Sequence, residues 1–364
     1  MRITRLCLFN FRNMASAEIV PGDSITVLHG LNGQGKTNLL EAIHMLGHAR
    51  PFRPAKTAEL VMHGEAASFI RGEIRSSNSF SEILIHLEGV NRRVKVDGKP
   101  VHRSTELHGR LGVLLFSPED TAMVRLGPET RRRYLDRAIY GSEVTFLKDY
   151  HDYYRILKQR NHLLKSGNRE GLEEWTEQLA EAGARLMARR REFTRRLDRI
   201  FGAHYSNIAG AEEKVALLYK PDSGESEDDA ARLKELFDSG LQSDIRHGAT
   251  GRGPHRDDLQ FMINGRALRT FGSQGQQRSF VLALKMAELD SIQETLGEPP
   301  VLLLDDMSSE LDRRRSTNLL EFVRQRGIQS FITTTDRNSL PSGMVEMSLF
   351  YRVEEGKLTY EGTT

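Results

Sequence analysis

The stretch "GLNGQGKT", residues 30–37, decides the fold of this chain. It fits the pattern G-x-x-x-x-G-K-[ST] in full. The run "SITVLH" before it is typical of a short buried strand, and the segment after it repeats apolar residues at helical spacing. Glycines let backbone N–H groups close around phosphate oxygens, and the helix N-terminus adds a partial positive charge. The flanking strand and helix favour a nucleoside triphosphate site over a glycine-rich turn without a ligand.

Different residues of this loop are expected to contact different parts of a bound Mg–ATP. Lys36 is expected to reach the β- and γ-phosphates, and the Thr37 hydroxyl to bind Mg²⁺. The full set of expected loop contacts is Gly30, Leu31, Asn32, Gly33, Gln34, Gly35, Lys36, Thr37 and Asn38.

A second segment supplies carboxylates. "VLLLDD", Val301–Asp306, is typical of a buried parallel strand whose C-terminal end opens onto a nucleotide. We expect Asp305 to hold Mg²⁺, usually through water, and Asp306 to orient and polarise the attacking water. A helix cap or turn is the alternative for such a pair of aspartates.

A third segment, "GSQGQQRSF" at residues 272–280, precedes an apolar helix predicted over Ser279–Leu296. Unpaired N–H groups and the helix dipole form an anion site at such a position, with Ser273 and Gln274 as extra donors. A turn followed by an ordinary N-cap is the alternative.

The composition indicates a globular cytoplasmic protein. The chain has 364 residues, 38% of them hydrophobic, and a net charge of +2. Its single cysteine, Cys7, excludes an internal disulfide, and no Cys/His cluster has the spacing of a structural zinc site. The N-terminus lacks the apolar core of a signal peptide, and nowhere do about 18 apolar residues run together. We therefore expect no membrane association.

The periodicity of the apolar residues changes twice along the chain. Strand-like alternation dominates the first part, helical periodicity follows it, and alternating strands and helices return near the C-terminus. We predict an α/β body with a mixed sheet, formed by residues 1–117 and 246–364. Residues 118–245 are predicted to form an inserted α-helical lobe.

Arginine accounts for 40 of the 52 basic residues. Two clusters in the predicted helical lobe are candidates for neutralising DNA phosphates, and no base-reading motif accompanies them. The clusters are Arg131, Arg132 and Arg133, and Arg189, Arg190 and Arg191. A solvated helix face paired with Glu and Asp is the alternative for both.

The order and spacing of the motifs resemble those of the ABC-type ATPase superfamily. In that superfamily a signature segment of one subunit closes over the γ-phosphate bound to another, which implies this role for Ser273. "SSELD", Ser308–Asp312, resembles the D-loop, so Asp312 is expected at the same nucleotide. Thr335 stands where the superfamily has a switch histidine, and Asp306 replaces the usual Glu. Both departures predict slow hydrolysis, because Thr cannot carry a proton charge and Asp is one methylene shorter.

Within this superfamily the whole chain resembles the RecF family of bacterial repair proteins. The resemblance is carried by "LFNFRN", "GLNGQGKTNLLEAI", "RPFR", "GPHRDDL", "GSQGQQRS" and "LLLDDMSSELDRRR". It implies an ATP-dependent homodimer that binds double-stranded DNA at single-strand gaps. It also implies action with RecR and RecO to help RecA displace single-strand binding protein in gap repair, replication restart and the SOS response. By the same resemblance Arg12 and Asn13 approach the nucleotide, although the end of a surface strand is an equal alternative.

Two other functions fit parts of the sequence. One is the ATPase subunit of a transport or translation system, which the Arg-rich insertion and the missing switch histidine disfavour. The other is a nucleotide-gated scaffold that does not hydrolyse ATP. His255 and Arg256 in "GPHRDD" either report the nucleotide state to the signature helix or form a hydrogen-bonded structural loop.

Overall fold

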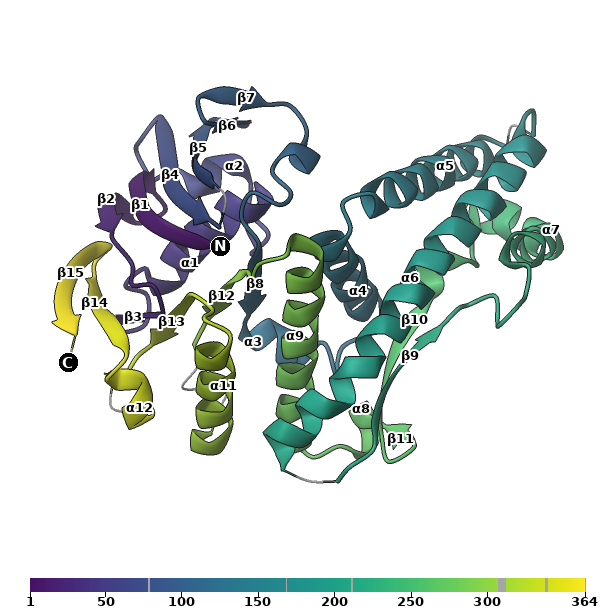
Figure 1. Cartoon of the computed structure of the whole chain (residues 1–364). Coiled ribbons are helices and arrows are strands. Elements are labelled where there is room, and N and C mark those ends of the chain that lie inside the picture. The colour runs from purple at the N-terminus through teal and green to yellow at the C-terminus, as the bar shows by residue number, and fades with distance from the viewer. Residues whose placement is uncertain (78, 168, 211, 307–311, 338–339, 364) are drawn as a thin grey trace. The chain divides into compact units, whose positions relative to one another are not determined.

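The computed structural model in Figure 1 describes residues 1–364 apart from 78, 168, 211, 307–311, 338–339 and 364. The chain forms two compact units. The first comprises Met1–Thr121, Asn207–Gly210 and Arg278–Thr364, and the second comprises Ala122–Ser206 and Ala211–Gln277.

An antiparallel sheet of six strands forms one layer of the first unit, in the order β2-β1-β4-β5-β6-β7. Its strands are β1 (Arg2–Phe11), β2 (Met14–Ile19), β4 (Ala67–Ser76), β5 (Ser79–Glu88), β6 (Asn91–Val96) and β7 (Lys99–Val101). Apolar residues alternate with polar ones along β5, so that Ile83, Ile85 and Leu87 are buried on one face. A tight turn joins β6 to β7, where Asp97 and Gly98 both have positive φ, 51° and 77°.

A mixed sheet forms the second layer, in the order β15-β14-β3-β13-β12-β8. Its strands are β3 (Ile25–His29), β8 (Val113–Phe116), β12 (Val301–Leu304), β13 (Ser330–Thr334), β14 (Ser348–Glu354) and β15 (Lys357–Thr363). The five strands from β14 to β8 are parallel, and only β15 pairs antiparallel. The carboxyl ends of β3, β12 and β13 therefore meet at one edge of the sheet, where a ligand binds in such folds.

The helix α1 (Lys36–His48) fills the space between the two sheets. Its apolar residues Leu39, Leu40, Ile43 and Leu46 are fully buried in one core with residues of both sheets. Figure 1 shows α9 (Gln274–Leu296) and α11 (Arg313–Gln325) along the mixed sheet. The remaining short helices of this unit are α2 (Thr57–Leu60), η1 (Ser104–Glu106), α3 (Pro118–Ala122) and α12 (Ser342–Val345). This arrangement confirms the predicted α/β class with a mixed sheet and added helices.

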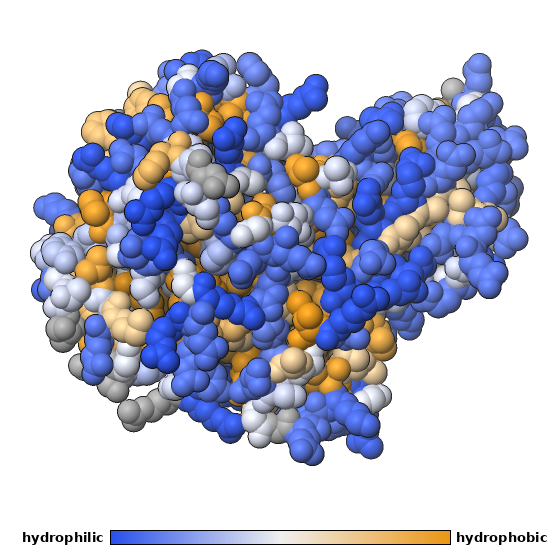
Figure 2. Space-filling view, in the orientation of Figure 1, coloured by the Kyte–Doolittle hydropathy of each residue, from blue (hydrophilic) through white to orange (hydrophobic). Residues whose placement is uncertain are grey.

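The second unit consists of helices and a small antiparallel sheet of the order β11-β10-β9. Its elements are α4 (Pro128–Ser142), α5 (Phe146–Ser166), α6 (Leu172–Ala209), β9 (Val215–Lys220), α7 (Asp229–His247), η2 (Pro254–Arg256), β10 (Asp258–Ile263), β11 (Arg266–Ala267) and α8 (Leu268–Phe271). On the face shown in Figure 2, the part of this unit that holds α5 and α7 is mostly hydrophilic. No helix among the described residues is long and apolar enough to cross a bilayer.

The division between the units differs from the predicted one over residues 246–277. The sequence division places this segment in the α/β body, with a boundary that falls inside α7. In the structure the segment lies in the second unit, because β10 pairs with β9 along its whole length, from Asp258↔Lys220 to Ile263↔Val215. A pairing between strands 38 to 48 residues apart in the chain is a better guide to where a unit ends than the local pattern of apolar residues.

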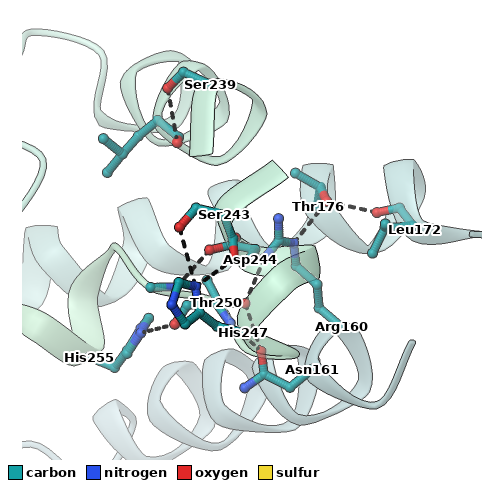
Figure 3. A network of polar contacts seen from close by, with 12 residues as sticks. Arg160, Asn161, Leu172, Thr176, Ser239, Ser243, Asp244, His247, Thr250 and His255 are labelled. Atoms are coloured by element: carbon teal, nitrogen blue, oxygen red, sulfur yellow. Dashed lines mark hydrogen bonds and ion pairs between the residues drawn. The ribbon is translucent and has the colours of Figure 1, made fainter. Parts of the chain in front are cut away.

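A buried polar network joins α5, α6 and α7 in the second unit (Figure 3). The fully buried Arg160 donates to Thr176 Oγ1 at 3.0 Å, Asp244 Oδ2 at 2.8 Å and Thr250 Oγ1 at 2.6 Å. Breaking one partner of such a pair leaves a buried charge uncompensated and is strongly destabilising. We infer that this network keeps the three helices in register.

His255 lies at the end of the same network and is neutral. Its Nε2 donates to the Thr250 carbonyl oxygen at 3.0 Å, and its Nδ1 accepts from the Tyr153 hydroxyl at 2.7 Å. Burial lowers the pKa of His255 from 6.5 to about 4. Both ring nitrogens have hydrogen-bond partners, Tyr153 of α5 and Thr250 just before the loop. This matches the alternative that "GPHRDD" is a hydrogen-bonded structural loop.

The neutral state of His255 predicts a pH-dependent stability. The folded pKa lies below the unfolded one, so the unfolded chain binds more protons between pH 4 and pH 6.5. Stability contributed by this residue is complete above pH 6.5 and falls as the pH drops towards 4, by up to about 3 kcal/mol. Chemical denaturation of wild type and of His255→Gln, whose amide keeps one donor and one acceptor, measures this effect. The two stability curves should converge as the pH is lowered, and parallel curves over this range would contradict the assignment.

Candidate nucleotide-binding site

The loop between β3 and α1 has a backbone that only glycine accommodates at two positions. Gly30 has a φ of 148°, and a Cβ there would lie 2.3 Å from the carbonyl oxygen of Val353. Gly35 has a φ of 116°, and its Cβ would lie 2.8 Å from Oδ1 of Asn13. The glycines of the motif are thus required by packing against β14 and the β1–β2 turn as well as by backbone conformation.

Lys36 folds back over the start of the loop. Its Nζ donates to the carbonyl oxygens of Gly30 at 2.6 Å and Leu31 at 2.9 Å. Burial lowers the pKa of Lys36, and the carboxylates of Asp306 and Asp305 partly offset this shift. The ammonium is therefore held at the loop and next to the acidic end of β12, where phosphate oxygens can replace its backbone acceptors.

Asp305 accepts hydrogen bonds from two threonines, Thr37 at the start of α1 and Thr333 on β13. The Thr37 hydroxyl donates to Asp305 Oδ1 at 2.9 Å, and the Thr333 hydroxyl donates to the same oxygen at 2.8 Å. Thr333 also accepts from the backbone N–H of Asp306 at 2.8 Å. The predicted pairing of Thr37 with Asp305 is thus present as a direct contact between residues 268 positions apart.

Sequence reasoning missed Thr333 and selected Thr335 from the same "ITTTD" segment. The signal that could have found Thr333 is register: β12 and β13 run parallel with Leu304 opposite Ile332, which places Asp305 beside Thr333. Thr335 follows β13 and is exposed at the edge where β3 leads into the loop. Its expected contact with a γ-phosphate stays a prediction.

The oxygen pair at this edge fits a magnesium ion. Thr37 and Asp305 offer a hydroxyl and a carboxylate oxygen within 2.9 Å of each other. Mg²⁺ takes oxygen ligands, usually one or two from the protein and the rest from water and phosphate. These residues are therefore the ones that would hold the ion.

Asp306, two residues after the end of β12, has a strained backbone conformation. Its φ of 50° lies in the left-handed region, which is uncommon for a residue other than glycine. Outliers of this kind cluster at functional sites, where the surrounding structure holds them. Here the hydrogen bond from its own N–H to Thr333 supplies part of that support.

Gln34 at the tip of the loop is braced from two sides. Its carbonyl oxygen accepts from Asn13 Nδ2 at 3.0 Å and from the Gly356 N–H at 2.9 Å. Its side-chain oxygen accepts from the Glu355 N–H at 2.6 Å. The loop is thus held in shape by the turn between β14 and β15 and by the turn between β1 and β2.

Arg12 and Asn13, expected near the nucleotide, support the loop and α1 in the structure. Arg12 Nε donates to Glu41 Oε2 at 2.9 Å, and Arg53 donates to the same fully buried carboxylate at 2.7 Å. Asn13 Oδ1 accepts from Asn38 Nδ2 at 2.8 Å. The network links the base of α1 to the loop tip, so these residues position the site, and their contact with a nucleotide stays a prediction.

Ser273 is the N-cap of α9, and the helix begins earlier than predicted. α9 starts at Gln274 rather than Ser279, so most of the "GSQGQQRSF" segment is helical. Ser273 Oγ accepts from the Gln276 N–H at 3.2 Å, and Gln276 Oε1 accepts from the Ser273 N–H at 2.7 Å. This reciprocal capping box satisfies two end groups of the helix. The alternative given for this segment, an ordinary N-cap, therefore describes the local structure. A contact between Ser273 and a phosphate stays a prediction.

Asp312 likewise caps a helix. Its side chain accepts from the Arg315 N–H at 3.0 Å at the start of α11, and its carboxylate also pairs with the Arg315 guanidinium. The first four residues of "SSELD", 308–311, lie outside the described residues.

Comparisons with known proteins place this site in a family. A family model described as the RecF/RecN/SMC N terminal domain matches residues 2–359. A "DNA replication and repair protein RecF" from Trichlorobacter lovleyi is 54% identical over 100% of this chain and 99% of its own length. The protein of the same name from Geobacter sulfurreducens is 46% identical, over 99% of this chain and 100% of its own.

The chain belongs to the RecF family.

Solved structures agree with this assignment. The structure described as "the recombination mediator protein RecF-ATPrS in RecFOR pathway" has a TM-score of 0.90 and 33% identity, covering 99% of this chain and 98% of its own. A Smc head domain from Pyrococcus furiosus has a TM-score of 0.57 at 14% identity, over 99% of this chain and 96% of its own, and shares the fold. The expected RecF-like, ABC-type ATPase head fold is thus confirmed.

Two arginines proposed for DNA contact in this RecF-family chain are buried in ion pairs. Arg131 binds both carboxylate oxygens of Asp258, at 2.8 Å and 3.0 Å. Arg190 is 0% exposed and binds Asp136 at 2.8 Å and 2.9 Å and Asp257 at 3.2 Å. We withdraw both as proposed DNA contacts, because their guanidinium groups are committed inside the second unit.

Arg132 and Arg191 also face partners of their own unit. Arg132 donates to the carbonyl oxygen of Asp257 at 2.6 Å, and Arg191 binds both carboxylate oxygens of Asp229, at 2.8 Å and 3.1 Å. Burial of these side chains is partial. They hold α4 and α6 to neighbouring elements, and their contact with DNA stays a prediction.

Arg133 and Arg189 are the more exposed members of the two clusters. The Arg133 side chain is 77% exposed and pairs with Glu129, and the Arg189 side chain is 43% exposed and pairs with Asp149 at 3.1 Å. Exposed pairs of this kind are weak and exchange with other ions. These two residues stay proposed contacts, but the clusters as wholes match the alternative of a helix face paired with acids.

Proposed function

We propose that this chain binds ATP with Mg²⁺ and uses it in DNA replication and repair, as the names of its relatives indicate. The observation that supports this most directly is the joining of Lys36, Thr37 and Asp305 at one edge of the mixed sheet. A lysine held at a glycine loop beside a hydroxyl–carboxylate pair is the arrangement that a magnesium–triphosphate requires.

The same edge supports slow ATP hydrolysis. Bound Mg²⁺ supplies neutralisation of the charge that develops on the β- and γ-phosphates. Lys36 adds a fixed positive charge, and Asp306, whose carboxylate acts on the Lys36 ammonium, orients the attacking water in this proposal. Asp306 is shorter than the usual Glu, and Thr335 cannot carry a proton charge, so turnover is slow.

Two copies of the chain close on ATP in this proposal. Ser273 and the first turn of α9 are contributed to the nucleotide of the partner subunit, and Asp312 lies at the same contact. The exposure of Ser273 and its position at a helix N-terminus support this role. Hydrolysis then resets the dimer.

The proposed substrate is double-stranded DNA at gaps and junctions with single strands. The chain acts with RecO and RecR to promote loading of RecA in recombinational repair, replication restart and the SOS response, in the cytoplasm. The structure described as RecF-ATPrS names the RecFOR pathway for that protein, at 33% identity to this chain.

One preparation of the protein tests this proposal. Sedimentation and anisotropy of a labelled gapped duplex are measured with ATP, with ADP and without nucleotide. We expect a dimer and DNA binding at least about tenfold tighter with ATP than with ADP, because a ligand shifts an equilibrium towards the state that it binds. A monomer in all three conditions, with equal DNA affinity, would contradict the proposal.

A further inference from the structure

One face of α5 carries two lysines, Lys158 and Lys165, that form no ion pair among the described residues. A surface hollow of about 400 Å³ lies along this helix, lined by Tyr154, Leu157, Lys158, Asn161, His162 and Lys165. The lining includes two lysines, a histidine, an amide and a phenol, and no carboxylate. The hollow therefore offers hydrogen-bond donors and positive charge to a ligand.

These lysines differ from the arginine clusters, whose members pair with acids or backbone carbonyl groups of their own unit. Lys158 and Lys165 are exposed, and neither makes an ion pair with another residue in the described part of the chain. The two acids of α5 are engaged elsewhere, since Asp149 pairs with Arg189 at 3.1 Å and Asp152 with Arg155 at 3.4 Å. The net positive charge of this face is thus available to an external anion.

The floor of the hollow is rigid. Asn161 Oδ1 accepts from both the N–H and the hydroxyl of Thr250, each at 2.8 Å (Figure 3), which leaves the Asn161 Nδ2 hydrogens for a ligand. The neighbouring Arg160 anchors the same turn of α5 to Asp244 at 2.8 Å. A donor whose rotamer is already fixed loses little entropy when it binds an anion.

The spacing of the two lysines favours a regular polyanion. Lys158 and Lys165 are two helical turns apart, which corresponds to about 10 Å along α5. This length matches about three steps of a nucleic-acid strand, whose phosphates follow one another at about 3.4 Å along the axis. An acidic peptide without regular structure has no fixed charge spacing that would match two lysines at this separation.

From these observations we infer that the α5 hollow binds the phosphodiester backbone of a nucleic-acid strand through Lys158, Lys165 and Asn161. The inference rests on the proposed function in DNA repair and deepens it. It adds a contact surface to the exposed arginines that stay proposed contacts, Arg133 and Arg189. Sequence-independent phosphate contact of this kind fits a protein without a base-reading motif.

The test compares Lys158→Gln/Lys165→Gln with two matched controls. Lys148→Gln removes an exposed lysine of α5 outside the hollow, and Lys158→Arg/Lys165→Arg keeps both charges. Anisotropy of a labelled gapped duplex is measured with ATP from low to moderate salt, and thermal unfolding checks the fold. We expect Lys158→Gln/Lys165→Gln to bind the duplex about tenfold more weakly near 0.15 M salt. Its slope of log affinity against log salt concentration should be smaller by about 2. Both controls should bind like wild type.

The outcomes separate this inference from the proposed function. If wild type fails to bind DNA with ATP, the proposed function falls and the inference with it. If wild type binds and the Gln pair binds equally with the same slope, only the inference is overturned. Loss of binding to a labelled oligoglutamate, with DNA affinity unchanged, would assign the hollow to an acidic peptide and also overturn it.

Discussion

Lys36→Ala should lose ATP affinity by at least about 100-fold, with no measurable hydrolysis. Hydrogen bonds to charged groups contribute about 1.5–3 kcal/mol each, and Lys36 is expected to make two to the β- and γ-phosphates. Two such bonds would contribute about 3–6 kcal/mol together. A 100-fold loss corresponds to about 2.8 kcal/mol, just below the low end of that sum, so it is the minimum expected effect. Titration of a fluorescent ATP analogue and a steady-state phosphate assay measure the two effects.

The matched control for this change is Lys99→Ala, which removes an exposed lysine of the antiparallel sheet. Thermal unfolding without nucleotide checks whether the loss of the bonds to Gly30 and Leu31 disturbs the loop. ATP should raise the unfolding temperature of wild type and Lys99→Ala but not that of Lys36→Ala, because only a bound ligand stabilises the folded state. An equal rise for all three proteins would show that the nucleotide binds elsewhere.

Ser273→Arg should abolish dimerisation on ATP while leaving ATP binding intact. In the proposed dimer the first turn of α9 meets the partner's triphosphate, where a guanidinium replaces a small hydroxyl and cannot be accommodated. Ser273 is exposed, so the substitution meets no packed core in the single chain. Sedimentation with ATP should show a monomer at concentrations about tenfold above those at which wild type is dimeric.

Two further variants separate this contact from the helix cap. Ser273→Asn keeps an acceptor for the Gln276 N–H. Ser273→Ala removes the helix cap at a cost of about 1 kcal/mol. If the cap alone mattered, Ser273→Ala would fail to dimerise and Ser273→Asn would succeed. If the contact with the partner's triphosphate matters, both should dimerise better than Ser273→Arg. Retention of a full ATP dimer by Ser273→Arg would refute the proposed clamp.

The nucleotide loop could be predicted from the sequence because its determinants are local. A glycine pattern, a preceding apolar strand and a following amphipathic helix lie within a few turns of chain, and each is visible as spacing. The turn at Asp97 and Gly98, the strand Val301–Leu304 and the helix over Arg313–Gln325 were predictable for the same reason. Resemblance in order and spacing of motifs then led to the family that the comparisons show.

Contacts between distant segments decided the rest. Thr333 lies beside Asp305 only because β12 and β13 pair in one register, and a shift of two residues would have placed Thr335 there. From the sequence, Arg190 looks like one of three adjacent surface cations. In the structure it is buried and pairs with Asp136 and Asp257.

The sequence by itself determined the local elements and the loop that receives a triphosphate. The tertiary structure alone decided which charges are neutralised inside the protein and which, like Lys158 and Lys165, remain available outside. The physical reason is that an ion pair or a ladder of strands depends on distance in space, which the order of residues along the chain does not contain.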